Sequence, residues 1–147
     1  MKKASYIFYL IIFLSVHYVN AQTKENHGNV INTFLKIGYK AKVSINYEIQ
    51  IINNLTIAPT ILIPLDFDIF NISLGARADY YFDDLIKLPE IWDIYSGIEA
   101  KIMINGDDFN FNIHAGTEYR FHKRWGVIAE FGAGSELTGG IGMAFHL

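Results

Sequence analysis

The chain has 147 residues, of which 51% are hydrophobic and 18% charged, and its formal net charge is −3. This length suits one domain, and the slight negative charge without a basic stripe excludes nucleic acid as an expected partner. The chain contains no cysteine, which excludes disulfides and thiol chemistry. No phosphate-binding loop, nucleotide fingerprint or histidine cluster is present, so we expect no cofactor and no metal site.

The first 21 residues have the layout of a secretory signal peptide. Two lysines form a basic start, an apolar run Tyr6–Val16 follows, and Ala21 precedes Gln22. A single membrane anchor is the alternative, but the run is short for a helix that spans a membrane. We therefore expect residues 1–21 to be a signal peptide and residues 22–147 to form the folded domain.

Alternation of apolar and polar residues predicts a series of strands. The clearest is Phe109–Phe121, where one apolar and one polar face alternate over the whole segment. This strand is long for a globular protein and suits one that crosses a membrane at a tilt. In chain order, the clear strands are Lys42–Ile51, Leu55–Leu65, Phe70–Phe82, Trp92–Ile104, Phe109–Phe121, Trp125–Gly134 and a last one that ends at Leu147.

An eighth strand, Asn29–Gly38, is inferred because a bacterial membrane barrel with both chain ends on one side needs an even number of strands. The alternative is that residues 34–50 form one long strand of an open or oligomeric sheet. Pro59 and Pro64 each remove a ladder donor, so we expect bulges or a shortened strand there.

The connections are short, with one exception. Asn105-Gly106 is a strong hairpin signal. The long connection is Asp83–Ile91, in which we expect a helical turn before Pro89.

Alternation alone does not separate a membrane barrel from a soluble one, but the glycines favour the membrane form. Apart from Gly139, the strand glycines lie on the polar face, where small residues make room inside an eight-stranded barrel. On a surface that faces water, they would only weaken the strands.

The charged residues on the same face nearly cancel in sign, and buried charges must be paired. We therefore predict a charge network in the lumen, with a solvated face as the alternative. The predicted members are Lys42, Glu48, Arg77, Asp79, Glu99, Lys101, His114, Glu118, Arg120 and Glu130.

Six aromatic residues gather at the ends of neighbouring strands, around two turns that strand direction places on the same rim. Aromatic girdles at a membrane–water boundary have this arrangement. A small core under a loop is the alternative. The predicted girdle residues are Tyr80, Phe82, Trp92, Tyr119, Phe121 and Trp125.

The segments Leu74–Ala100, Gly116–Gly134 and the terminal GGIGMAFHL resemble the small eight-stranded outer-membrane β-barrels of Gram-negative bacteria, the OmpX/OmpA-like porin family. The resemblance implies an all-β, antiparallel up-and-down transmembrane barrel, and outer-membrane lipid and lipopolysaccharide as its surroundings. It also implies insertion by the barrel-assembly machinery, which reads the last strand. Family members usually end in an aromatic residue, whereas this chain carries Phe145 and ends in Leu147. We expect a monomer.

These patterns predict an outer-membrane barrel with a side-chain-filled lumen, a structural or surface role and no catalysis. One alternative is a periplasmic, lipocalin-like carrier of a small apolar ligand, with the apolar face inside. The other is a lipid A-modifying enzyme, which would need a serine, a histidine and a carboxylate at one rim. The residues of those types are Ser44, Ser73, Asp79, His114 and Glu118, and nothing in the sequence brings a serine within reach of His114.

Overall fold

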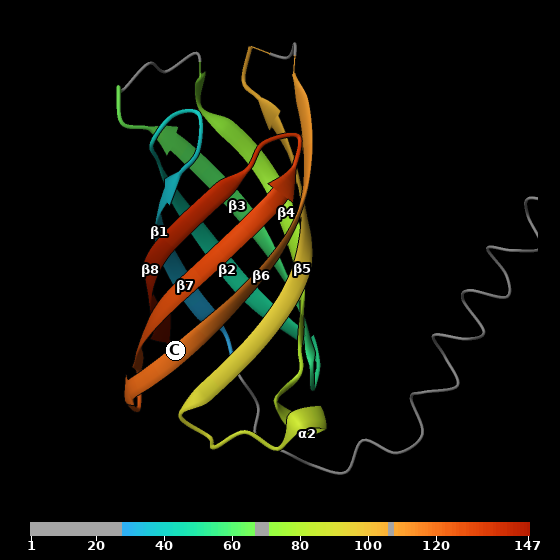
Figure 1. Cartoon of the computed structure of the whole chain (residues 1–147), viewed down its shortest axis with the longest axis vertical. Helices are drawn as coiled ribbons and strands as arrows, with labels where there is room; N and C mark the ends of the chain where they lie inside the picture. Colours follow the sequence, from blue (N-terminus) through green and yellow to red (C-terminus); the bar gives the residue numbers. More distant parts are fainter. Residues whose placement is uncertain (1–27, 67–70, 106–107) are drawn as a thin grey trace, which may run out of the picture.

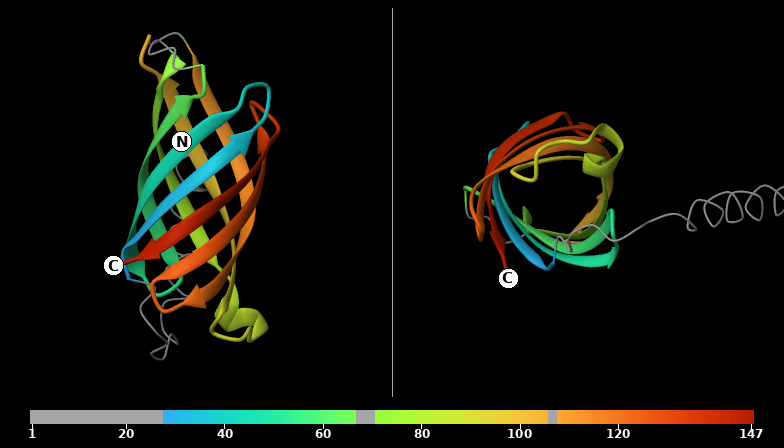
Figure 2. Two further views of the ribbon diagram at one scale, coloured as in Figure 1. Left: turned by 90° about the vertical axis from the view of Figure 1, so that its left-hand side faces the viewer. Right: turned by 90° about the horizontal axis from the view of Figure 1, so that it is seen from below.

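The computed structural model describes residues 28–66, 71–105 and 108–147, and every structural statement below refers to them. The expected signal peptide, residues 1–21, lies outside them. Eight strands form one closed antiparallel barrel in chain order, and β1 pairs with β8 to complete the ring (Figures 1 and 2). The strands are β1 (Val30–Ile37), β2 (Lys42–Ile52), β3 (Leu55–Pro64), β4 (Ser73–Tyr81), β5 (Trp92–Met103), β6 (Phe109–His122), β7 (Trp125–Gly134) and β8 (Thr138–His146).

The predicted eight-stranded up-and-down barrel is therefore confirmed, and the open-sheet alternative is wrong. We call the end that carries Leu147 and the start of β1 the terminal end, and the opposite end the far end. The connections β2–β3, β4–β5 and β6–β7 lie at the terminal end (Figure 1). The other four connections lie at the far end, where β1 ends at Ile37.

The longest fully described connection, between β4 and β5, contains the short helix α2 (Asp83–Ile86) at the terminal end (Figure 2). Lys87 ends the helix in the left-handed conformation, with φ 52°, and Pro89 follows two residues later. The predicted helical turn is confirmed. Within the ranges given above, no helix is long and apolar enough to cross a membrane.

Side chains alternate strictly between the outside and the lumen, and their chemistry is the reverse of a soluble protein's. Ile98 points outward and is 49% exposed, whereas the next residue, Glu99, points inward and is 3% exposed. Across the described residues, 18 polar or charged side chains are buried but only eight hydrophobic ones are. The core of this barrel is therefore a polar interior.

The lumen glycines make room for those polar side chains, as the sequence predicts. A Cβ on Gly97 would collide with the carbonyl oxygen of Ala78 and the carboxylate of Asp79. A Cβ on Gly126 would collide with the carboxylate of Glu118. Crowding inside an eight-stranded barrel thus leaves no room for a side chain at Gly97, and a side chain at Gly126 would displace Glu118.

The expectation that prolines would bulge or shorten the third strand is wrong. Strand β3 runs unbroken over Leu55–Pro64, and its pairing with β2 keeps the same register on both sides of Pro59. The register shift lies instead between Gln50 and Ile52, at the terminal end of β2. Pro64 is the last residue of the strand, where a missing donor is tolerated, and Pro59 has its ring on the outer surface.

Candidate functional site

Arg77 lies at the centre of a buried charge cluster in the lumen. Its Nε donates to Asp79 at 2.6 Å and its Nη2 donates to Glu130 at 2.8 Å. With the Asn46 amide in the orientation that best satisfies its neighbours, Nη1 donates to the Asn46 oxygen at 3.0 Å. The guanidinium is fully buried and thereby joins β2, β4 and β7. We call Arg77, Asp79, Glu130 and His114 the Arg77 cluster.

His114 completes this cluster from β6. Its Nε2 lies 2.7 Å from Nη2 of Arg77 and contacts the carboxylate of Asp79. Its Nδ1 is buried and has no hydrogen-bond partner. Because Arg77 and Asp79 are two residues apart on one strand, the period of two places both on the lumen face beside His114.

A lysine extends the cluster toward the far end. Nζ of Lys36, on β1, lies 3.1 Å from Glu130 and 3.4 Å from Glu99. Lys36 is buried, and sequence reasoning missed it. Its place in the alternation of the first strand is the signal that could have found it.

Glu136 closes the far end of the network from the β7–β8 connection. Its carboxylate accepts from Nζ of Lys101 at 2.7 Å and from Nζ of Lys42 at 3.1 Å. Partial burial opposes the ionised form, but the two lysines outweigh it and hold the pKa of Glu136 below 4.5. Glu136 lies outside the strands, so no alternation could have predicted that it turns inward.

Toward the terminal end, two further pairs lie inside the barrel. Arg120 donates to Asp93 at 2.6 Å, and Nε2 of His146 lies 2.7 Å from Glu118. The first pair joins β6 to β5 and the second joins β8 to β6. Asp93 and His146 were not predicted members, although both fall on the inner face of their strands.

Glu48 is held by neutral groups. The Tyr81 hydroxyl donates to it at 2.7 Å and the Asn32 amide at 2.6 Å.

The structure turns all ten predicted lumen residues inward. Eight are buried, and Lys42 and Arg120 are half-buried near the two ends.

The six predicted girdle residues all lie near the terminal end, on the outer surface of β4, β5, β6 and β7 or beside it. They form close pairs: the rings of Trp92 and Tyr119 lie 4.8 Å apart, and those of Tyr80 and Phe82 lie 5.1 Å apart. The ring of Trp125 lies 4.8 Å from the ring of Phe145, which was predicted as part of the assembly signal. The remaining girdle residue is Phe121, and the remaining assembly residue is Leu147; both are exposed.

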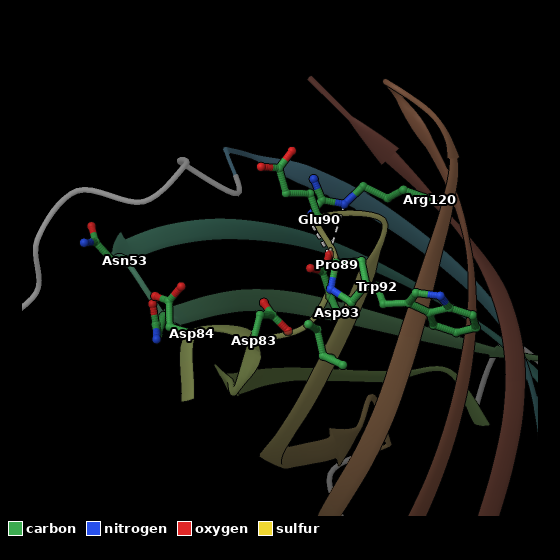
Figure 3. Close-up of a pocket in the computed structure, with 10 residues that line it drawn as sticks. Asn53, Asp83, Asp84, Pro89, Glu90, Trp92, Asp93 and Arg120 are labelled. Atoms are coloured by element: carbon green, nitrogen blue, oxygen red, sulfur yellow. Dashed lines mark hydrogen bonds and ion pairs between the residues drawn. The ribbon is translucent and has the colours of Figure 1, made fainter. Parts of the chain in front are cut away.

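A small hollow of about 40 Å³ lies at the terminal end beside α2 (Figure 3). Figure 3 shows the Arg120–Asp93 ion pair across it. This volume holds a few water molecules and no organic ligand.

Within the described part of the chain, no group of three His, Cys, Asp or Glu residues could hold a metal ion. The hollow is lined by Asn53, Asn54, Asp83, Asp84, Leu88, Pro89, Glu90, Trp92, Asp93 and Arg120.

The candidate catalytic residues do not form the side-chain arrangement that the catalytic alternative needs. The ring of His114 contacts Arg77 and Asp79, and the hydroxyl of Ser96 reaches only the backbone oxygen of His114. Ser44 hydrogen-bonds to Asn46. Over the described ranges, the structure therefore places no serine hydroxyl against the His114 imidazole.

The carrier alternative is wrong. A carrier of an apolar ligand needs an apolar interior, and this lumen is filled by paired charges and their hydrogen-bond partners.

Comparison with known proteins places the fold. No protein-family model and no curated protein sequence matches the chain. The chain is similar to a structure from the de novo design of transmembrane β-barrels, with a TM-score of 0.72 and 12% identity over 84% of this chain and 98% of that one. The two share one fold. The N-terminal β-barrel domain of Pseudomonas aeruginosa OprF is also similar, with a TM-score of 0.57 and 15% identity over 83% of this chain and 98% of that one. At these identities the likeness extends to the eight-stranded barrel alone.

Proposed function

We propose that the chain is an integral outer-membrane barrel protein with a side-chain-filled lumen and a structural or surface role without catalysis. The observation that carries the proposal is the reversed alternation, seen in outward Ile98 and inward Glu99. Soluble monomers rarely expose apolar patches larger than a few hundred Å². An apolar band on every strand of a closed ring suits lipid as the surrounding solvent.

Backbone pairing supports the same environment. In hydrocarbon every backbone N–H and C=O must find an internal partner, and a closed barrel has no free strand edge. The β1–β8 ladder completes this closure over the whole of β1. Strands of about 9–11 residues cross a bilayer when tilted. The observed strands have eight to fourteen residues.

The lumen supports a plugged barrel rather than a pore. An eight-stranded interior is just wide enough for its own side chains. The Arg77 cluster joins β4, β6 and β7, and Lys36 and Glu136 continue the ion pairs toward the far end. A side-chain-filled lumen leaves no catalytic or transport role for the interior, so the role lies in the surface that the barrel presents.

The remaining features of the proposal concern place and partners. Residues 1–21 would direct export, the aromatic girdle would lie at the lipid–water boundary near the terminal end, and the outer surface would contact lipid and lipopolysaccharide. The barrel-assembly machinery would read the last strand through Phe145 and Leu147. We propose a monomer that binds neither nucleic acid nor a cofactor.

Cell fractionation and heat-modifiable gel mobility test the proposal. The full chain, expressed in a Gram-negative host, should appear in the outer-membrane fraction, resist extraction by urea, and migrate differently before and after boiling. A soluble periplasmic protein with unchanged mobility would refute it. An altered lipid A mass spectrum on overexpression would refute the absence of catalysis while leaving the location intact.

A further inference from the structure

The β2–β3 and β6–β7 connections are both two-residue hairpin turns at the terminal end, but they differ in charge. The first is Asn53-Asn54 and carries no charge, whereas the second is Lys123-Arg124 and has both side chains exposed. Neither turn contains a residue with positive φ, so the backbone conformation does not explain the difference. We call Lys123-Arg124 the basic turn and Asn53-Asn54 the neutral turn.

The cations of the basic turn have no carboxylate partner within the described ranges. Every described lysine and arginine of the strands and of the far-end connections forms an ion pair. Lys87, Lys123 and Arg124, all in terminal-end connections, form none there. The backbone N–H of Arg124 donates to Nδ1 of His122 at 3.3 Å, so Nε2 of this exposed ring carries a proton and is a further donor. The basic turn therefore presents two unpaired positive charges and a neighbouring donor.

The surroundings of the basic turn also differ from those of Lys87. Lys87 shares the segment Asp83–Glu90 with three acidic residues, so that connection is negative overall. No acidic residue lies between Glu118 and Glu130, and both of these are buried in the lumen. The outer face around the basic turn is therefore positive, and an anion is the partner that complements it.

Aromatic side chains flank the basic turn. Phe121 and Trp125 are 54% and 42% exposed, and the ring of Trp125 lies 4.8 Å from that of Phe145 on β8. The neutral turn is flanked by Ile51 and Leu55 instead. In membrane barrels such aromatic rings lie at the level of the lipid headgroups. With the girdle at the boundary, as proposed above, the basic turn lies among those headgroups.

We propose that the basic turn binds the phosphate of an anionic phospholipid headgroup, such as phosphatidylglycerol, in preference to a zwitterionic one. The planar fork of Arg124 suits two phosphate oxygens, and Lys123 adds a point charge. A zwitterionic headgroup carries its own cation, which opposes the two charges of the turn. This inference rests on the proposed function, because the girdle must lie at the boundary. It also goes beyond that function, since an apolar outer surface does not distinguish one headgroup from another.

Quenching of Trp125 fluorescence by brominated lipid tests the proposal. The chain has two tryptophans, and Trp92→Phe leaves Trp125, next to Arg124, as the single reporter. The purified full-length barrel is placed in phosphatidylethanolamine vesicles with equal fractions of either brominated phosphatidylglycerol or brominated phosphatidylcholine. We expect an about tenfold higher association constant for phosphatidylglycerol at Trp125, because each exposed cation attracts anionic lipid. Equal quenching by the two lipids would overturn the inference.

Two double variants in the same background locate the preference. Lys123→Asn combined with Arg124→Asn gives the basic turn the residues of the neutral turn, which suit a hairpin, and should abolish the preference. Lys40→Gln combined with Lys87→Gln is the matched control, because it also removes two exposed cations, but from other connections. The control should keep the preference. Loss in both variants, or in neither, would show that the basic turn is not the site.

The same measurements separate this inference from the proposed function. Strong quenching by both lipids without a preference refutes this inference alone, because Trp125 then lies in the bilayer as the proposed function requires. An absence of quenching by either lipid refutes both together. A preference that millimolar inorganic phosphate removes at constant ionic strength would assign the turn to a free anion, and so refute the phospholipid.

Discussion

The Arg77 cluster offers the sharpest test of the buried ionic lumen. In Arg77→Met the guanidinium is lost, and Asp79 and Glu130 remain in the bore without their shared partner. Breaking a buried ion pair by removing one member costs about 3–5 kcal/mol. Glu130 keeps Lys36 at 3.1 Å and Asp79 keeps His114, so we expect the lower end of that range, about 3 kcal/mol.

Urea unfolding in lipid vesicles, followed by the fluorescence of Trp92 and Trp125, measures this loss. Arg77→Lys keeps the charge but not the planar fork, so it should lose less than Arg77→Met. Adding Glu130→Gln to Arg77→Met should recover part of the loss, because one uncompensated charge disappears. If Arg77→Met unfolds within about 0.5 kcal/mol of the wild type, the value typical of surface changes, then water solvates these charges and the plugged lumen is refuted.

Three further predictions concern the outward side chains, the space around the lumen glycines and the charge of Glu136. Ile98→Arg should lower the free energy of unfolding in vesicles by about 2–4 kcal/mol, because it places a cation on the lipid-facing surface; an unchanged urea midpoint would contradict the outward band. Gly97→Ala should lower the free energy of unfolding by about 1–3 kcal/mol through overpacking. Gly139→Ala should change it by no more than about 0.5 kcal/mol in the same urea titration. Equal effects would show that lumen crowding is not the reason for the glycines. Because the pKa of Glu136 is lowered, its ionised form stabilises the barrel above pH 4.5, and this contribution is lost as the pH falls below that value. Glu136→Gln should therefore flatten the fall of the urea midpoint as the pH is lowered below 4.5, and a parallel fall in both proteins would contradict the Glu136 ion pairs.

The number of strands, their order and the direction of their side chains could be predicted from the sequence, because alternation in a strand has a fixed period of two. In Phe109–Phe121 one apolar face persists over the whole segment, so the direction of every side chain follows from its parity. The crowding at Gly97 was equally accessible, since small residues beside long charged ones are needed in so narrow a bore. The β1 strand required the additional argument that a closed bacterial barrel has an even number of strands.

Ion-pair partners were harder to predict from the sequence. They depend on how far along the barrel each residue lies and how far its side chain extends, and not only on which face of the strand carries it. Parity placed Arg77 and Glu130 inside, but the three-way contact with Asp79 depends on the stagger of strands around the ring. Glu136 lies in a connection, where no periodicity applies. The error at Pro59 arose because a lost ladder donor was expected to displace the strand, whereas the neighbouring pairs hold the register.

The seam between β1 and β8 has a consequence for how the chain reaches its native state. The first and the last strands of the folded domain are direct neighbours, from Val30 and His146 at one end to Ile37 and Gly139 at the other. Such distant pairing carries a large loop-closure cost and makes folding slow. Until β8 is paired, the ring is open and β1 and β7 each lack one neighbour. A change that prevents β8 from pairing would therefore destabilise the whole ring and not only its last strand.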